Sequence, residues 1–189
     1  MAEDLSIRAF LAVPLTRYFD IDVAPLINTL KNEYPHVRWV SPEQIHITLH
    51  FFGSIPMDDF QRISRIVNPL VADTSPFAIT LEGLGAFPAI DRPSVIWIGV
   101  GGETDLLTQL QQRLEGQFLG AGFPCEDRSF KPHLTIGRVK EAKREMRLGN
   151  HKFGPTQAKR IEEILLLRSH LTPGGASYET MQTYSLSKT

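Results

Sequence analysis

Two histidine–threonine pairs in the chain have residue types and a spacing that could carry proton-transfer chemistry. The unit His, apolar, Thr, apolar begins at His46, with Thr48 two residues later, and again at His133, with Thr135. An imidazole titrates near neutral pH, so it can serve as a general acid or as a general base. A hydroxyl beside each imidazole adds a hydrogen-bond donor. The repeated unit therefore indicates a catalytic arrangement.

Both units have the alternation that is typical of a β-strand. Successive side chains of a strand point to opposite faces, so His46 and Thr48 share one face, while Ile47 and Leu49 point to the other. The same parity holds around His133. Two such strands side by side would place two imidazoles and two hydroxyls in one polar cleft, each backed by an apolar core.

A third His-x-Thr sequence, His170 to Thr172, lacks this support. Ser169 precedes it and Pro173 follows it, so no alternation surrounds it and proline ends any strand there. We expect no direct catalytic role for this third copy.

The elements that must position the two pairs follow from apolar periodicity and from glycine and proline. We expect strands over 7–13, 45–52, 77–84, 95–100, 161–167 and 178–186 and around His133, helices over 22–34, 58–70 and 104–119, and a loop over 85–93. Hairpin-like turns favour antiparallel pairing. These elements predict an α+β fold with two pseudo-symmetric lobes of antiparallel sheet and flanking helices. The lobes would form a single bilobal domain over residues 1–189, with the cleft between them.

Composition restricts the classes of function. Twenty Lys and Arg residues against 21 Asp and Glu residues give a formal net charge of −1, which argues against nonspecific coating of nucleic acid. Cys125 is the only cysteine, so an internal disulfide and a thiolate metal cluster are both excluded. The acidic N-terminus and the shortness of the apolar runs favour a cytoplasmic protein with no membrane span.

At this point the sequence resembles the two-histidine phosphoesterases, and within them the RNA 2′,3′-cyclic phosphodiesterases, historically called 2′-5′ RNA ligases. The resemblance spans nearly the whole chain and rests on residues 8–13, 39–40, 46–53, 95–99, 130–138 and 165–169, followed by Gly175 and Tyr178. It implies a bilobal α+β fold and hydrolysis of an RNA-terminal 2′,3′-cyclic phosphate to a 2′-phosphomonoester, without metal or cofactor. Reversible 2′,5′ joining of RNA ends is a second activity of the family. We expect a monomer.

Phosphodiester hydrolysis needs hydrogen bonds to the nonbridging oxygens, a base for the attacking water and an acid for the leaving oxygen. We expect His46 to protonate the leaving 3′ oxygen, His133 to activate water, and Thr48 and Thr135 to bind the phosphate. The symmetry of the motifs allows the two histidines to exchange roles. Two alternative functions remain open: a phosphodiesterase for small cyclic nucleotides or ADP-ribose cyclic phosphate, and an RNA-end-binding module without turnover.

Further substrate-binding candidates surround the four central residues. They are Arg138, His50, Phe52, Ser169 and Tyr178. His50 shares the parity of His46 and is expected at the edge of the cleft, too far along the strand for shared metal ligation with it.

Arg138 and the segment after it leave two readings open. Strict alternation puts Arg138 on the face opposite His133, so either the chain turns at Gly137 or this arginine is a surface residue. The basic segment from Arg138 to Lys152, which includes Lys140, Lys143, Arg144 and Arg147, is either a solvated surface or a guide for RNA phosphates.

Overall fold

The structure, a computed structural model, describes residues 6–126, 128–139, 146–172 and 175–187. The strands are β1 (Ser6–Pro14), β2 (Val37–Trp39), β3 (His46–Pro56), β4 (Phe77–Ala89), β5 (Arg92–Gly102), β6 (His133–Val139), β7 (Lys159–Ile161), β8 (Glu163–Thr172) and β9 (Gly175–Ser185). The helices are α1 (Thr16–Glu33), α2 (Asp59–Ala72) and α3 (Thr104–Gly120), with short 3₁₀ turns η1 (Pro42–Gln44) and η2 (Leu148–Asn150). No helix in these ranges is both long and apolar enough to cross a membrane.

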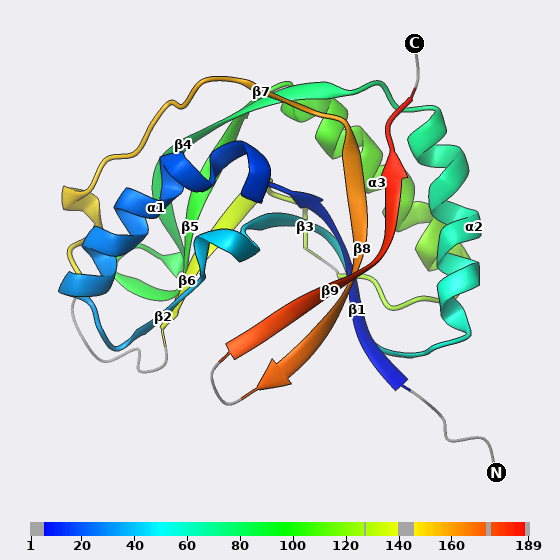
Figure 1. Cartoon of the computed structure of the whole chain (residues 1–189), viewed down its shortest axis with the longest axis horizontal. Helices are drawn as coiled ribbons and strands as arrows, with labels where there is room; N and C mark the ends of the chain where they lie inside the picture. Colours follow the sequence, from blue (N-terminus) through cyan, green and yellow to red (C-terminus); the bar gives the residue numbers. More distant parts are fainter. Residues whose placement is uncertain (1–5, 127, 140–145, 173–174, 188–189) are drawn as a thin grey trace.

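The strands form two antiparallel sheets, which confirms the predicted α+β class (Figure 1). One sheet has the order β3-β1-β8-β9 and the other has the order β2-β6-β5-β4-β7. Each sheet contains one histidine strand, β3 or β6. The lobes are interleaved along the chain, because the first sheet combines the first and last long strands.

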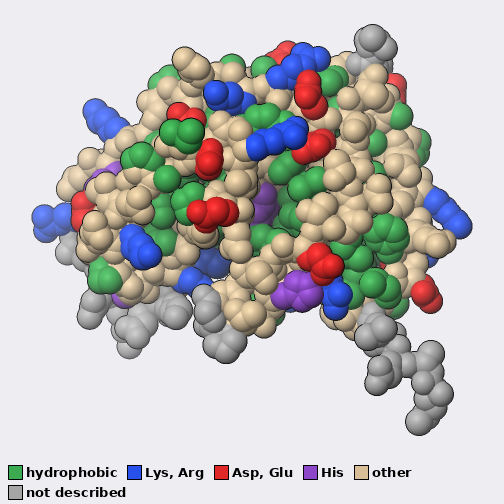
Figure 2. All heavy atoms as spheres, in the orientation of Figure 1, with side chains coloured by type: hydrophobic (Ala, Val, Ile, Leu, Met, Phe, Trp, Pro, Cys, Tyr) green, Lys and Arg blue, Asp and Glu red, His purple; other side chains and the backbone are tan. Residues whose placement is uncertain are grey.

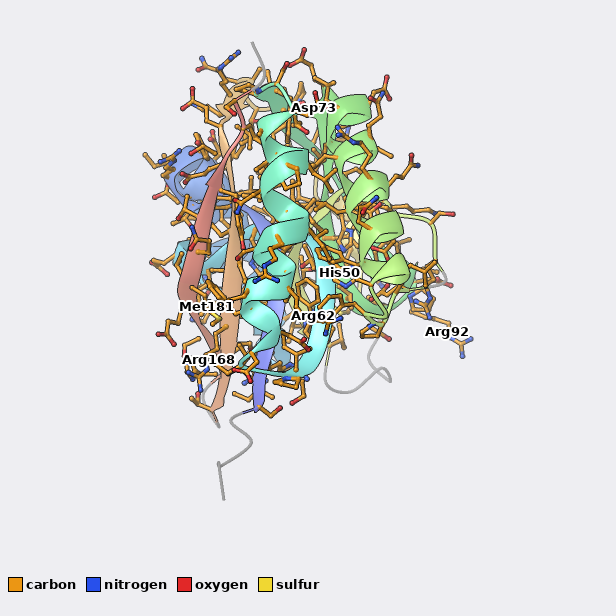
Figure 3. The ribbon with its side chains drawn as sticks, turned by 90° about the vertical axis from the view of Figure 1, so that its right-hand side faces the viewer. His50, Arg62, Asp73, Arg92, Arg168 and Met181 are labelled. Carbon is orange, nitrogen blue, oxygen red and sulfur yellow. The ribbon has the colours of Figure 1, made fainter. Side chains whose placement is uncertain are left out.

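Helices α2 and α3 lie side by side against the four-stranded sheet (Figure 3). In α2 the buried residues Ile63, Val67 and Val71 recur every fourth position, so they form one stripe that faces the core. Helix α1 contacts β2 and η1 on the other side of the molecule and buries a similar stripe. The helices thus cover the back face of each sheet.

The structure differs from the sequence-based expectation at several places. Strand β2 was not expected, and β8 extends beyond the expected end at residue 167 to Thr172. Helix α1 begins at Thr16, six residues before the predicted start, because Phe19 is buried one turn before Val23 and continues the apolar stripe. The predicted loop over 85–93 is instead the end of a β4–β5 hairpin. Register shifts near Gly83 and Pro88 accommodate the glycines and prolines of this segment without ending the strands.

Candidate active site

Strands β3 and β6 contact each other where the two sheets meet, and this contact brings the two histidine motifs together. His46 and His133 are the first residues of their strands, and they lie close enough for the charge of His133 to affect the titration of His46. Thr48 is exposed and Thr135 is half-buried. Figure 2 shows histidine atoms set deep in the middle of one face of the molecule, among mixed charges.

Both imidazoles are held by the same kind of hydrogen bond, from Nδ1 to a backbone carbonyl. His46 Nδ1 donates to the Gln44 carbonyl at 2.9 Å, and His133 Nδ1 donates to the Lys131 carbonyl at 2.7 Å. The acceptor is two residues earlier in each case. Because a carbonyl can only accept, both Nδ1 atoms carry hydrogen, and a neutral ring then has its lone pair on Nε2. Within the described chain neither Nε2 has a protein partner, so both are available to a substrate.

Each imidazole also packs against two aromatic rings. His46 lies 5.0 Å from Phe10 and 5.2 Å from Tyr178 between ring centroids. His133 lies 5.2 Å from Phe87 and 6.3 Å from Trp97. These contacts restrict the rotation of both rings.

Phe87 and Trp97 were not predicted as site residues. Trp97 lies directly opposite Thr135 on the neighbouring strand, and only the strand order could have revealed this. Its indole covers Gly85, where an added Cβ would lie 2.3 Å from the ring, so a side chain at this position would displace the indole.

Burial and neighbouring cations shape the titration of the site. Burial lowers the pKa of His46 below its ordinary value, and the charges of Arg138 and His133 lower it further against the opposing effect of the Gln44 carbonyl. Burial raises the pKa of Tyr178, while Arg138 and Arg38 act in the opposite direction. Arg138 therefore lies within electrostatic reach of both His46 and Tyr178.

A β-bulge explains how Arg138 comes to lie there. In the pairing of β5 with β6, Trp97 is opposite Thr135 but Ile96 is opposite Gly137, so Ile136 is an extra residue. The extra residue reverses the alternation, and Arg138 returns to the face of His133 and Thr135. The strand continues through Gly137, so the reading in which the chain turns there was wrong. Arg138 is exposed, as the other reading held, but it lies on the face of His133 and not on the opposite one.

Bulges in β3 have the opposite consequence for His50 and Phe52. Leu49 and Phe52 are extra residues in the pairing of β3 with β1. Consequently His50 lies opposite Leu11 on the core face, and both predicted side chains are buried, His50 at 4% and Phe52 at 2% exposure. The prediction that these two side chains line the substrate cleft was wrong, because strict alternation does not hold beyond Thr48.

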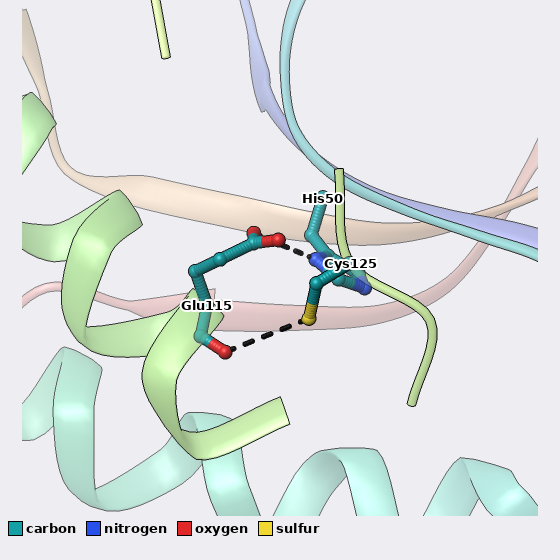
Figure 4. A group of neighbouring side chains, drawn as sticks. All are labelled: His50, Glu115 and Cys125. Carbon is teal, nitrogen blue, oxygen red and sulfur yellow. Dashed lines mark hydrogen bonds and ion pairs between the residues drawn. The ribbon is translucent and has the colours of Figure 1, made fainter. Parts of the chain in front are cut away.

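His50 instead belongs to a cluster behind β3 (Figure 4). Its Nδ1 donates to Glu115 Oε2 at 3.0 Å, and the same carboxylate accepts from Gln111 Nε2 at 3.1 Å and from the Glu126 backbone N–H at 3.3 Å. Cys125 completes a group of metal-type donor atoms within 4.8 Å of one another. Burial and then Glu115 raise the pKa of Cys125 to about 11, so the thiolate that a metal requires is disfavoured. The cluster joins β3 to α3 and the segment after it.

Two other predicted residues lie on the same face as Phe10. Ser169 and Tyr178 are directly opposite each other in β8 and β9, and Tyr178 contacts Phe10 at 5.1 Å between centroids. The neighbouring His170 instead binds Glu179, with 2.9 Å between Nε2 and Oε2. Of the basic segment, Lys140, Lys143 and Arg144 lie outside the described residues.

Comparison with known proteins gives consistent matches. The model of the 2′-5′ RNA ligase superfamily matches residues 19–172. A protein of Methanothermobacter thermautotrophicus named RNA 2′,3′-cyclic phosphodiesterase is 35% identical, and the alignment covers 96% of this chain and all of that protein. One of the same name from Archaeoglobus fulgidus is 33% identical, with 94% and 99% covered.

Solved structures agree on the fold. A crystal structure of a Thermus thermophilus protein matches with a TM-score of 0.80 and 28% identity, covering 95% of this chain and 98% of that one. Escherichia coli LigT, solved with 3′-AMP, matches with a TM-score of 0.79 and 22% identity, covering 97% and 99%. Because the family model covers most of the sequence and relatives above 30% identity align along nearly its whole length, the chain belongs to the 2′-5′ RNA ligase superfamily.

Proposed function

We propose that this protein hydrolyses the 2′,3′-cyclic phosphate at an RNA end to a 2′-phosphomonoester, without a metal ion or a nucleotide cofactor. The observation that carries the proposal is the matched pair of imidazoles, each fixed through Nδ1 to a backbone carbonyl two residues earlier. The relatives that are 35% and 33% identical are named RNA 2′,3′-cyclic phosphodiesterase, which supports RNA ends as the substrate.

The phosphate would bind between the two histidine motifs. Thr48 and Thr135 share faces with His46 and His133, so their hydroxyls can donate to the nonbridging oxygens. Arg138 adds a fixed positive charge on the same face, and a guanidinium can bind a phosphate through two parallel hydrogen bonds. Ser169 and Tyr178 lie farther along this surface, where the nucleoside would bind.

In the proposed reaction, His133 takes a proton from water as the water oxygen forms a bond to phosphorus. His46 gives a proton to the 3′ oxygen as its bond to phosphorus breaks, which leaves a 3′ hydroxyl and a 2′-phosphomonoester. A lowered pKa makes protonated His46 a stronger acid, and the anionic substrate offsets the nearby cations that disfavour its protonation. A 5′ hydroxyl in place of water would give the 2′,5′ joining reaction.

A chelator-treated preparation should be tested on three substrates: an oligoribonucleotide with a 2′,3′-cyclic phosphate, a 2′,3′-cyclic mononucleotide and ADP-ribose cyclic phosphate. We expect turnover of the RNA, with the phosphate retained at the 2′ position. Preference for either small substrate would support the alternative reading, and RNA binding without product would support a binding module. Activity that disappears with the chelator and returns with a metal would refute the cofactor-free mechanism.

Variants test the assignment of the two histidines. His46→Ala and His133→Ala should each lose about 10²- to 10⁴-fold in kcat, the usual contribution of general acid–base catalysis. His170→Ala, in the third His-x-Thr sequence, is the matched control and should retain activity because its imidazole is bound to Glu179. A substrate with sulfur as the 3′ leaving atom needs little protonation, so it should restore His46→Ala but not His133→Ala. Rescue of His133→Ala instead would reverse the two roles.

We also propose a cytoplasmic monomer. Cys125 is the only cysteine of the chain, and its raised pKa keeps it a thiol, which suits a reducing compartment. Light scattering at micromolar concentration should give the mass of one chain, 21.3 kDa. A mass of twice that value would contradict the monomer.

A further inference from the structure

Two arginines face each other at the edge of the five-stranded sheet. Arg38 in β2 is directly opposite Arg138 in β6, and residues opposite each other in an antiparallel pair share one face. Arg138 lies on the face of His133 because of the bulge at Ile136, so Arg38 lies there too. Like charges directly opposite each other on neighbouring strands are destabilising, so this pairing weakens the folded state.

In the part of the chain that the structure describes, no carboxylate forms an ion pair with either arginine, and both side chains are exposed. Several other arginines have an acidic partner close in space, such as Glu163 for Arg17 and Asp73 for Arg113. Two unneutralised guanidinium groups at one end of the site form a place where anions are attracted.

The guanidinium of Arg38 reaches from its own sheet to the other one. A Cβ placed at Gly175, the first residue of β9, would lie 3.5 Å from Arg38 Nη2. Burial raises the pKa of Tyr178, whose ring packs on His46, and the positive charge of Arg38 is close enough to oppose that effect. Arg138 shares strand β6 with His133 and Thr135, whereas Arg38 lies in β2, the edge strand on the far side of β6 from the rest of the sheet. Arg38 is therefore one step farther from the imidazoles than Arg138.

From this order we propose that Arg38 forms a second phosphate subsite, which binds the phosphodiester on the 5′ side of the terminal nucleotide. Arg138 would serve the cyclic phosphate itself, and the terminal nucleoside would bridge the two subsites along Tyr178. An oligonucleotide has this second phosphate and a cyclic mononucleotide lacks it, so Arg38 selects RNA ends over small cyclic nucleotides. The inference rests on the proposed function.

The test compares Arg38→Gln with the wild type on two substrates, a short oligoribonucleotide with a 2′,3′-cyclic phosphate and the corresponding 2′,3′-cyclic mononucleotide without other phosphates. For the oligonucleotide we expect kcat/KM to fall about tenfold, the effect of losing one charge-assisted contact. For the mononucleotide we expect a change within about twofold. The dependence of log KM on log salt should also weaken by about 0.7, the share of one contact to a single strand.

Two further variants separate a local contact from general effects of charge or folding. Arg65→Gln removes the same charge from an exposed position on α2, a helix that packs against the four-stranded sheet, and should leave both substrates unchanged. Arg38→Lys keeps a cation at position 38 and should recover part of the loss on the oligonucleotide. Recovery by lysine would not follow from a purely structural role of the arginine.

The outcomes distinguish failure of the subsite from failure of the proposed function. A wild-type enzyme that turns over neither substrate would overturn the proposed function. A wild-type enzyme that is active on RNA while Arg38→Gln loses equally on both substrates would overturn the subsite and place Arg38 at the cyclic phosphate. No loss on either substrate, or an equal loss in Arg65→Gln, would identify Arg38 as a solvated surface residue.

Discussion

Removal of the Glu115 carboxylate should destabilise the protein without affecting its chemistry. In Glu115→Ala the N–H of His50 loses its only acceptor within the described structure, 3.0 Å away, and this side chain is 4% exposed. Gln111 and the Glu126 backbone each lose a hydrogen bond to the same group. A hydrogen bond to a charged group contributes about 1.5–3 kcal/mol, and an unsatisfied buried donor costs a similar amount.

For a chain of this length 1 kcal/mol corresponds to about 2–4 °C in the melting temperature. We therefore expect Glu115→Ala to melt about 3–12 °C below the wild type by differential scanning calorimetry. Glu115→Gln keeps an oxygen acceptor for the imidazole and should lose much less. His50→Leu removes the unpaired donor, so combining it with Glu115→Ala should cost less than the sum of the two single changes.

Activity measured well below the melting temperature provides the decisive comparison. Because the cluster lies behind β3, on the opposite face from His46, each of these variants should retain kcat/KM within about twofold. A folded His50→Leu protein that has lost catalysis would show that His50 lies at the substrate, and the bulge at Leu49 would then be wrongly placed. An unchanged melting temperature in Glu115→Ala would refute the role of the carboxylate.

Three further predictions concern His46, Cys125 and Gly85. The pKa of His46, followed by NMR of its ring protons, should lie below 6.5 and rise in Arg138→Gln, because the neighbouring cation disfavours the imidazolium; a fall would contradict the placement of Arg138. In the wild type the lowered pKa of His46 means that, as the pH falls, the unfolded chain binds this proton at a higher pH than the folded protein does. Lowering the pH from about 6.5 through the pKa of the folded protein should therefore reduce stability. Cys125, with a pKa of about 11, should react slowly with iodoacetamide at pH 8 and faster in Glu115→Ala; rapid alkylation of the folded wild type would rule out a shielded thiol. Gly85→Ala should displace the Trp97 indole, alter tryptophan fluorescence and reduce kcat, since that ring packs on His133; unchanged fluorescence would show that the indole does not cover this glycine.

The periodicity of the sequence predicted most of the elements, because buried stripes in helices and alternation in strands are set by local geometry. It did not predict how the strands are ordered. The assignment of β8 to the sheet of β1 and β3 depends on contacts between residues more than 100 positions apart. For the same reason Trp97 and Arg38 entered the site only with the structure, since each is placed there by a partner in another strand.

His50 and Arg138, which alternation places on the wrong face, differ from the four central residues in their position relative to a bulge. His46 and Thr48 precede the extra residue Leu49, and His133 and Thr135 precede Ile136, so the alternation that relates each pair is intact. His50 and Arg138 follow those bulges, and each therefore lies on the opposite face from the one that alternation predicts.

The two bulges are visible in the burial pattern of their strands, which only the structure supplies. After each motif two neighbouring residues are both buried, Leu49 with His50 and Ile136 with Gly137, whereas a regular two-faced strand buries every second residue. Each bulge falls within two residues of a motif threonine, so the two strands are regular through the histidine and threonine and then change face. In β6 this change delivers Arg138 to the side of the imidazoles, and in β3 it delivers His50 to the core. One local irregularity, used twice, thus adds a cation to one side of the site and an anchoring hydrogen bond behind the other.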